Sequence, residues 1–104
     1  MLQYSIYSVI SPEACSTILW RNPDETEAAA DAMGISSKRL SKLGLVDSVI
    51  EEPLGGFHKD PKDTFQRITK TLDEYLYNLK NKNIDDLLLK RRQRYKAIGE
   101  FNEI

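Results

Sequence analysis

The sequence predicts an α/β fold that is mostly helical, with two short strands. Three proline-led segments begin at Pro12, Pro23 and Pro61, each after a Ser, Asn or Asp that can cap a helix. After Pro61, apolar residues recur every three or four positions, which is the period of an amphipathic helix. Two further segments, Leu2–Ile10 and Leu45–Glu51, are rich in β-branched, aromatic and leucine residues and contain no Gly or Pro, as strands do.

The two predicted strands lack neighbours. In Leu2–Ile10 the apolar residues do not alternate strictly, which indicates burial on both faces. Two short strands cannot build a sheet of the usual size of about four to six strands. They would also leave open edges, which folded proteins avoid. We therefore expect a further part of a longer chain, or a partner, to supply the missing neighbours.

A first helix is expected after the Leu2–Ile10 strand. Ser11 is a good N-cap, Pro12 suits the first helical position, and Glu13 complements the positive end of the helix dipole. Four residues form its apolar stripe: Ala14, Cys15, Ile18 and Leu19. We interpret Cys15 as a small buried hydrophobe rather than a reactive thiol, because no nearby His or Lys would activate it.

Two more helices are expected before the second strand. Asn22 repeats the start signal of the first helix, and Gly34 ends the second one. The alanine content of this second helix indicates close packing against a neighbour. Ser36 or Ser37 caps a third, short helix that Gly44 ends.

Two longer helices are expected in the second half of the chain. The first begins at Asp60 and is broken at Asn81–Asn83. Its apolar face is interpreted as core or subunit interface and consists of Phe65, Ile68, Leu72, Tyr75, Leu76 and Leu79. The second runs roughly from Ile84 to Ile98, with acidic residues in its first turn and basic residues later, which suits the helix dipole. Gly99 ends it, and we expect the tail to fray.

Composition and charge narrow the class of protein. The 104 residues carry a net charge of −1 and include one cysteine, which excludes an internal disulfide and is typical of a reducing compartment. Residues 1–57 carry −4 and residues 58–104 carry +3, with the basic residues concentrated between Lys90 and Lys96. No apolar run approaches the roughly 20 residues that a membrane-spanning helix needs.

Several motifs resemble one family. Residues 1–13 (MLQYSIYSVISPE) closely resemble a signature stretch of the carboxyltransferase alpha subunit of multi-subunit acetyl-CoA carboxylase. Four later motifs also fit that family: ACSTILW at 14–20, LGLVDSVI at 43–50, EPLGG at 52–56 and RQRY at 92–95. Each motif alone is weak, but their order and spacing are specific and cover nearly all of the chain. Ala14 replaces a usual glycine, and Phe57 stands where a small residue is usual.

The resemblance implies a fold and a reaction. The fold is crotonase-like, in which stacked ββα turns form a superhelix, and this chain matches its C-terminal third. Residues 1–57 would belong to the C-terminal portion of the crotonase-like core, and residues 58–104 to a helical segment for packing and subunit contact. In the implied reaction, an enolate of acetyl-CoA attacks the carboxyl carbon of carboxybiotin and gives malonyl-CoA for fatty acid biosynthesis.

The resemblance also implies partners. These are the carboxyltransferase beta subunit, in an alpha2beta2 assembly, and the biotin carboxyl carrier protein, with no nucleic acid and no membrane. The implied compartment is the bacterial cytoplasm, or a plastid. In the family, the glycine-rich stretch that stabilises oxyanions lies upstream of the position that Met1 matches, so we expect no activity from these 104 residues alone.

The implied site lies where the first strand meets the first helix. Tyr7, Ser8 and Ser11 should border the carboxybiotin pocket, and Ser11 can also serve as a helix cap. Glu13 is a candidate acid–base carboxylate, because a Pro-Glu at the equivalent turn has that role in the wider crotonase superfamily. We favour the interpretation that Glu13 only complements the positive end of the helix dipole, since carboxyl transfer does not obviously require this carboxylate.

Other candidate sites have simpler explanations. His58 is the only histidine and follows Gly55 and Gly56, where we expect a tight turn with positive φ rather than a phosphate loop. No second His or Cys close to His58 completes a metal site. The basic run from Lys90 to Lys96 could contact nucleic acid or a coenzyme A phosphate, but we interpret it as a solvated helix face. The alternative function is a non-catalytic helical module for protein interaction.

Overall fold

The computed structural model describes residues 1–99, which form five α-helices and two short 3-10 turns. The helices are α1 (Pro12–Trp20), α2 (Thr26–Met33), α3 (Ser37–Lys42), α4 (Pro61–Lys80) and α5 (Ile84–Ala97). The 3-10 turns are η1 (Pro23–Glu25) and η2 (Phe57–Lys59). The predicted fraying of the tail beyond Gly99 lies outside the described residues.

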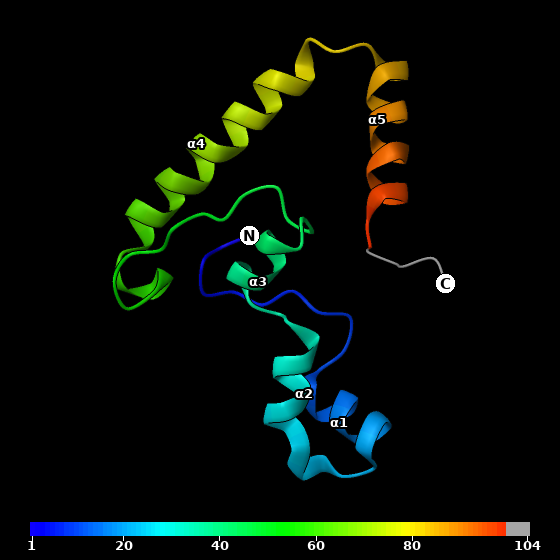
Figure 1. Cartoon of the computed structure of the whole chain (residues 1–104). Helices are drawn as coiled ribbons and strands as arrows, with labels where there is room; N and C mark the ends of the chain where they lie inside the picture. Colours follow the sequence, from blue (N-terminus) through cyan, green and yellow to red (C-terminus); the bar gives the residue numbers. More distant parts are fainter. Residues whose placement is uncertain (100–104) are drawn as a thin grey trace.

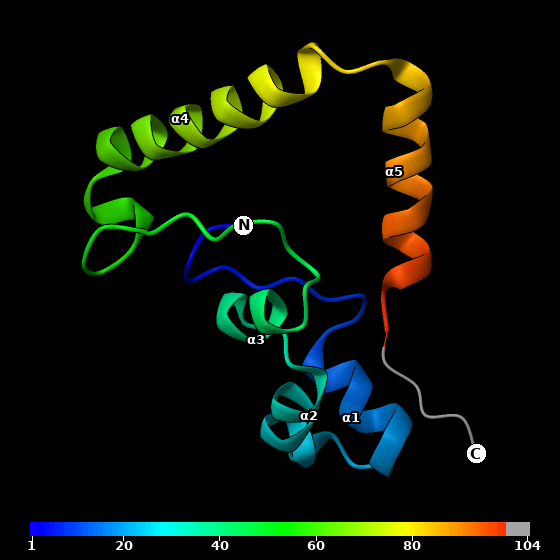
Figure 2. The same ribbon diagram turned by 45° about the horizontal axis from the view of Figure 1, so that its top comes forward.

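The chain has an open shape. In Figures 1 and 2, α4 and α5 form two arms joined at a bend, and α1 and α2 form a separate lobe, which we call the α1–α2 lobe (residues 11–34). The radius of gyration is 17.5 Å, whereas a compact domain of this length has about 13 Å. The accessible surface is 8859 Å², which is roughly 3,000 Å² more than a compact monomer of this mass exposes. Much apolar surface is therefore open to solvent.

The predicted helix starts are confirmed. Ser11, Ser36, Asp60 and Asn83 each accept a hydrogen bond from a backbone N–H in the first turn of the following helix. Asn22 also accepts such a bond, but it starts the turn η1, and α2 begins three residues later than the sequence predicts. These caps satisfy N–H groups that have no partner inside a helix.

The predicted helix ends are also close to those observed. Gly34 adopts a left-handed conformation with φ of 62° and caps α2. The last helix, α5, ends at Ala97, one residue before the predicted end. Gly44 has φ of 71° just beyond α3.

The predicted strands are wrong for the described residues. Leu2–Ile10 and Leu45–Glu51 do lie side by side, but they form a single parallel bridge, Leu2 to Ile50. The first segment turns instead of extending, because Ser5 donates two hydrogen bonds to the carbonyl of Leu2, from its backbone N–H at 3.2 Å and from its hydroxyl at 2.7 Å. A second bridge, between Ile6 and Ser36, is antiparallel.

The core of the described residues is small. Its buried hydrophobic residues are Ala29, which is 0 % exposed, and Leu40, which is 5 % exposed. Ala29 lies on α2, which packs against α1, as the alanine content predicts. Ser16 is fully buried there and donates a hydrogen bond to the carbonyl of Asn22. Cys15 is half-buried, so the prediction of a buried thiol is only partly met.

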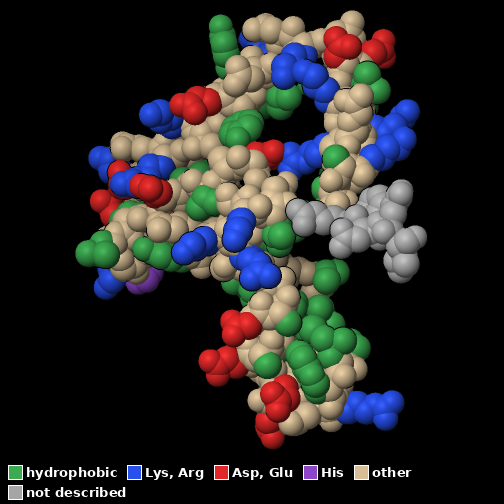
Figure 3. Space-filling model, viewed as in Figure 1, with side chains coloured by type: hydrophobic (Ala, Val, Ile, Leu, Met, Phe, Trp, Pro, Cys, Tyr) green, Lys and Arg blue, Asp and Glu red, His purple; other side chains and the backbone are tan. Residues whose placement is uncertain are grey.

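The prediction that the apolar stripes are buried is wrong within the described chain. On α4, Phe65 and Leu76 are 57 % and 62 % exposed, and on α1 Ile18 is 69 % exposed. Hydrophobic side chains accordingly appear on the surface of the α1–α2 lobe in Figure 3. Phe65 packs its ring edge-on against Phe57, but α5 turns away from α4 instead of folding back over it. The subunit-interface interpretation of the α4 stripe stays a prediction.

Candidate functional site

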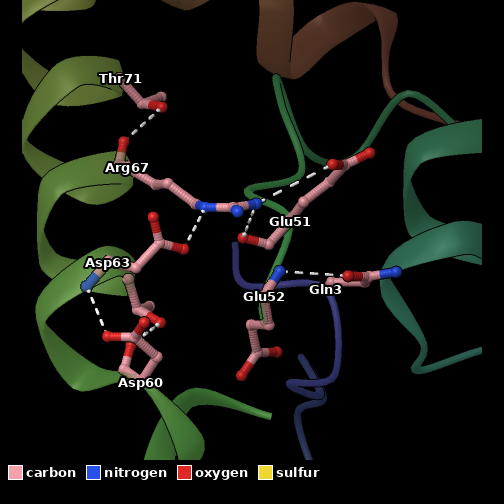
Figure 4. A network of polar contacts seen from close by, with 8 residues as sticks. Gln3, Glu51, Glu52, Asp60, Asp63, Arg67 and Thr71 are labelled. Carbon is pink, nitrogen blue, oxygen red and sulfur yellow. Dashed lines mark hydrogen bonds and ion pairs between the residues drawn. The ribbon is translucent and has the colours of Figure 1, made fainter. Parts of the chain in front are cut away.

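A polar network holds the N-terminal segment in place (Figure 4). The carboxylate of Glu52 accepts hydrogen bonds from the backbone N–H of Tyr4 at 2.6 Å and of Phe57 at 3.0 Å. The backbone N–H of Glu52 in turn donates to the side-chain carbonyl of Gln3 at 3.1 Å. The hydroxyl of Ser37 donates to the backbone carbonyl of Gln3. Three segments far apart in the sequence therefore meet around residues 3 and 4.

Arg67 connects the start of α4 to the same region (Figure 4). Its Nε donates to the carboxylate of Asp63 at 2.7 Å, which is an i,i+4 ion pair on the helix. Its Nη1 donates to the backbone carbonyl of Glu51 at 3.3 Å and lies 4.0 Å from the Glu51 carboxylate. The base of α4 is thus fixed against the segment that follows the Leu2–Ile50 bridge.

An apolar groove, which we call the turn groove, lies along the segment before α1. It has a volume of about 580 Å³, within the usual range for small-molecule sites. Its lining residues are Tyr7, Ser8, Val9, Ile10, Cys15, Met33, Ile35, Leu40 and Leu45. The backbone N–H of Tyr7 donates to the carbonyl of Ile35 at 3.1 Å, which holds one wall against the other.

The structure brings together two of the four predicted site residues. Tyr7 and Ser8 both line the turn groove. Ser11 is exposed, and its hydroxyl oxygen accepts a hydrogen bond from the N–H of Ala14 at 3.2 Å, so it acts as the N-cap of α1. Glu13 is exposed on the first turn of α1 and does not line this groove. Its placement matches the helix-dipole interpretation.

The glycine pair and His58 occupy a tight turn, as the sequence predicts. Gly55 and Gly56 have φ of 91° and 103°, conformations that a side chain would strain. The N–H of Gly56 donates to the carbonyl of Pro53 at 2.8 Å, so it is already used within the turn. His58 is exposed in η2. Among residues 1–99, no group of three or more His, Cys, Asp or Glu side chains is arranged to hold a metal ion.

A long-range ion pair, which sequence reasoning missed, joins α5 to the rest of the chain. The guanidinium of Arg94 donates a hydrogen bond to the carboxylate of Asp47. The hydrogen bond and the negative charge of Asp47 raise the pKa of Arg94 above its usual value. Residues 90–96 are all exposed, as the solvated-face interpretation predicts, and Arg94 additionally pairs with Asp47. No local pattern could reveal this pair, because the two residues are 47 positions apart.

None of the described helices has the length and apolar content that crossing a membrane requires.

Comparison with known proteins finds one family whose model covers almost the whole chain. The family described as acetyl co-enzyme A carboxylase carboxyltransferase-like matches residues 1–99. A carboxyl transferase subunit alpha of acetyl-coenzyme A carboxylase from Hydrogenovibrio crunogenus is 48 % identical over 102 residues, which is 98 % of this chain and 32 % of the relative. The corresponding subunit of Nitrosospira multiformis is 47 % identical over 104 residues, which is 100 % of this chain and 32 % of the relative.

A further relative, the subunit alpha 2 of Burkholderia thailandensis, is 46 % identical over 103 residues, covering 99 % of this chain and 32 % of its own length. The chain therefore spans about a third of the length of the curated relatives that it matches.

Proposed function

This chain belongs to the acetyl co-enzyme A carboxylase carboxyltransferase-like family, and from that membership we propose that it forms part of a carboxyltransferase alpha subunit. In this proposal the complete enzyme moves a carboxyl group from carboxybiotin to acetyl-CoA and yields malonyl-CoA. The observation that carries the proposal is the match of residues 1–99 to the family, together with relatives near 47 % identity. The crotonase-like fold is part of the same proposal.

The proposed reaction changes four bonds. The α carbon of acetyl-CoA loses a proton to give the enolate, the carbon–nitrogen bond of carboxybiotin breaks, and a carbon–carbon bond forms between the enolate carbon and the transferred carboxyl group. The proton ends on the ureido nitrogen of biotin, so atoms and charge balance. Negative charge develops on oxygen atoms during this exchange, and oriented N–H groups are the usual means of stabilising it. Because the N–H of Gly56 is bonded to Pro53, we assign no oxyanion role to this glycine.

We assign Tyr7 and Ser8 to the carboxybiotin side of the site. Both residues line the turn groove, whose other walls are apolar. Apolar walls exclude water from a bound ring, and a small number of polar groups fix its orientation. The hydroxyl of Ser8 can donate one hydrogen bond and accept others, and the phenol of Tyr7 can do the same. Their proposed task is to hold and orient the biotin ring.

The proposed partners follow from the family. A beta subunit would complete the carboxyltransferase, and a biotin carboxyl carrier protein would deliver the carboxyl group. The exposed stripe of α4 supports a role in subunit contact, since Phe65, Leu72 and Leu76 are more than half exposed. Unpartnered apolar faces of this kind are typical of surfaces that another polypeptide covers.

A chimera tests the proposal. The upstream two-thirds of the Nitrosospira multiformis alpha subunit would be joined to this chain and produced with the beta subunit of the same organism. We expect the chimera to form malonyl-CoA and the 104-residue chain alone to form none. If the chimera folds and binds the beta subunit without turnover, the enzyme assignment is wrong and the helical interaction module is the better interpretation.

The same chimera tests the two site residues. We expect Ser8→Ala and Tyr7→Phe to raise the KM for carboxybiotin by about three- to tenfold, the size of one lost hydrogen bond, without changing the KM for acetyl-CoA. Ser41→Ala is the matched control, because Ser41 is exposed on α3 and does not line the turn groove. An equal rise in KM for both substrates would contradict a specific contact with biotin.

A further inference from the structure

We propose that Glu52 is a positioning residue for the carboxybiotin side of the site. It clamps a tight turn near the start of the chain, and the clamped turn sets where the following residues enter the turn groove. The inference rests on the proposed function, because it gives Glu52 a task that is carried out through Tyr7 and Ser8. Glu52 does not line the turn groove itself, so its effect passes through the residues that it holds.

The turn comprises residues 2–5. The backbone N–H of Ser5 donates to the carbonyl of Leu2 at 3.2 Å, and the Ser5 hydroxyl donates to the same oxygen at 2.7 Å. Gln3 and Tyr4 are therefore the two central residues of a β-turn. The bond that closes such a turn leaves the N–H of Tyr4 free, so this N–H needs an acceptor from another part of the chain.

Glu52 holds both central residues from outside the turn. Oε2 of its carboxylate accepts the N–H of Tyr4 at 2.6 Å, and its backbone N–H donates to Oε1 of Gln3 at 3.1 Å (Figure 4). Oε1 of the carboxylate accepts the N–H of Phe57 at 3.0 Å. Hydrogen bonds to an ionised acceptor are stronger than those between neutral groups. Because both oxygens are engaged, the carboxylate has little freedom to rotate away from the turn.

The chain runs from the turn directly to the turn groove. The backbone N–H of Tyr7 donates to the carbonyl of Ile35 at 3.1 Å, and both residues line the groove beside Ser8. Tyr4 lies three residues before Tyr7, a separation of at most about 10 Å of extended chain. A displacement of Tyr4 is therefore transmitted to Tyr7 unless two intervening residues absorb it.

The turn has other supports that do not reach Tyr4. The hydroxyl of Ser37, a residue that is 5 % exposed, donates to the carbonyl of Gln3. The backbone N–H of Gln3 donates to the carbonyl of Ile50 at 2.9 Å. Loss of the Glu52 carboxylate should leave these bonds in place and release the side of the turn that leads to the groove. We therefore expect a shift of the groove residues rather than a loss of the fold.

Glu52→Met in the chimeric carboxyltransferase tests the inference. Methionine keeps the length of the side chain but lacks both carboxylate oxygens. We expect the KM for carboxybiotin to rise by about three- to tenfold, the size of one lost hydrogen bond, with the KM for acetyl-CoA unchanged. Glu52→Gln, which keeps one acceptor oxygen, should have a smaller effect. Glu51→Met is the matched control, because the Glu51 side chain is 82 % exposed and should leave both KM values unchanged.

Combined variants separate positioning from a general loss of stability. If Glu52 acts through the two groove residues, its substitution has little left to disturb once their hydroxyls are removed. In a chimera that carries Tyr7→Phe and Ser8→Ala, Glu52→Met should raise the KM for carboxybiotin by less than about twofold further. An independent effect would multiply with that of the double substitution instead, and it would identify a structural role.

Amide hydrogen exchange on the 104-residue chain provides a second measurement that needs no turnover. Glu52→Gln should speed exchange of the Tyr7 N–H, which bonds to Ile35 and not to Glu52. Glu51→Gln should leave it unchanged. Equal exchange in the two variants would show that the clamp does not reach the groove, and this comparison decides the question where Glu52→Met fails to fold.

Failure of this inference and failure of the proposed function give different results. A folded wild-type chimera without turnover would overturn the proposed function and the role of Glu52 with it. An active wild type whose Glu52→Met variant keeps its KM for carboxybiotin, or raises both KM values equally, would overturn the positioning role alone.

Discussion

Arg94 of α5 and Asp47 of the segment after α3 are joined by a hydrogen-bonded ion pair across 47 residues of sequence. Few other contacts bring α5 back to the first half of the chain, because α4 and α5 diverge from their bend (Figures 1 and 2). A helix of 14 residues is marginal by itself in water. Both side chains of the pair are largely exposed, so we expect it to restrain α5 only weakly.

Asp47→Asn should loosen α5. The amide still accepts a hydrogen bond, but it removes the negative charge that Arg94 contacts. We expect faster amide hydrogen exchange in residues 87–97 and unchanged exchange in α1, measured at a concentration where the chain is monomeric. In 1 M salt, exchange in the wild type should approach that of the variant. Asp73→Asn on the exposed face of α4 is the control, and equal exchange in both variants would refute the restraint.

Leu40→Ala should destabilise the first half of the chain strongly. Leu40 is 5 % exposed and is one of the two buried hydrophobic residues among residues 1–99. Truncation of a buried leucine costs about 2–5 kcal/mol through lost apolar burial and a residual cavity. Urea unfolding followed by the fluorescence of Trp20, the single tryptophan, measures the change.

Leu43→Ala is the matched control for Leu40→Ala. Leu43 lies three residues away and is 54 % exposed, so we expect a change within about 0.5 kcal/mol. Equal effects of the two substitutions would mean that Leu40 is not part of a cooperative core.

The helix starts could be predicted from the sequence because caps are local. Ser11, Asp60 and Asn83 each bond to an N–H two or three residues away, so a short pattern contains the whole interaction. The strands could not be predicted in this way. Leu2–Ile10 has strand-forming residues, yet Ser5 turns the chain after one bridge, and the pairing partner lies near Ile50.

The burial of an apolar stripe also cannot be predicted from its sequence pattern. The period of the α4 stripe shows that the helix has one apolar face, but it does not show what covers that face. Leu76 is 62 % exposed, and Phe65 stays 57 % exposed although the ring of Phe57 packs against it. At the candidate site, the resemblance led to Tyr7 and Ser8, which line a groove. It could not reveal Glu52, whose bonds to Tyr4 and Phe57 depend on the fold.

Glu52→Gln should weaken the junction between the N-terminal segment and the glycine turn. The carboxylate uses one oxygen for the N–H of Tyr4 and the other for the N–H of Phe57. A glutamine has a single acceptor oxygen, so one N–H loses its partner. We expect a loss of roughly 1 kcal/mol in the free energy of unfolding, measured by urea denaturation.

Glu51→Gln is the matched control for Glu52→Gln. The Glu51 carboxylate is 82 % exposed and lies 4.0 Å from Arg67. Exposed ion pairs contribute little to stability, so this substitution should have a smaller effect than Glu52→Gln. The reverse order would show that the Glu52 hydrogen bonds do not hold the junction.

Glu13→Gln should change kcat of the chimeric carboxyltransferase by less than tenfold. Glu13 is exposed on the first turn of α1 and does not line the turn groove, so it has the position of a residue that complements a helix N-terminus. Glu27→Gln, in the first turn of α2, is the matched control and should behave alike. Steady-state malonyl-CoA formation measures both. A hundredfold fall in kcat for Glu13→Gln alone, equivalent to about 2.7 kcal/mol, would instead identify Glu13 as an acid–base group.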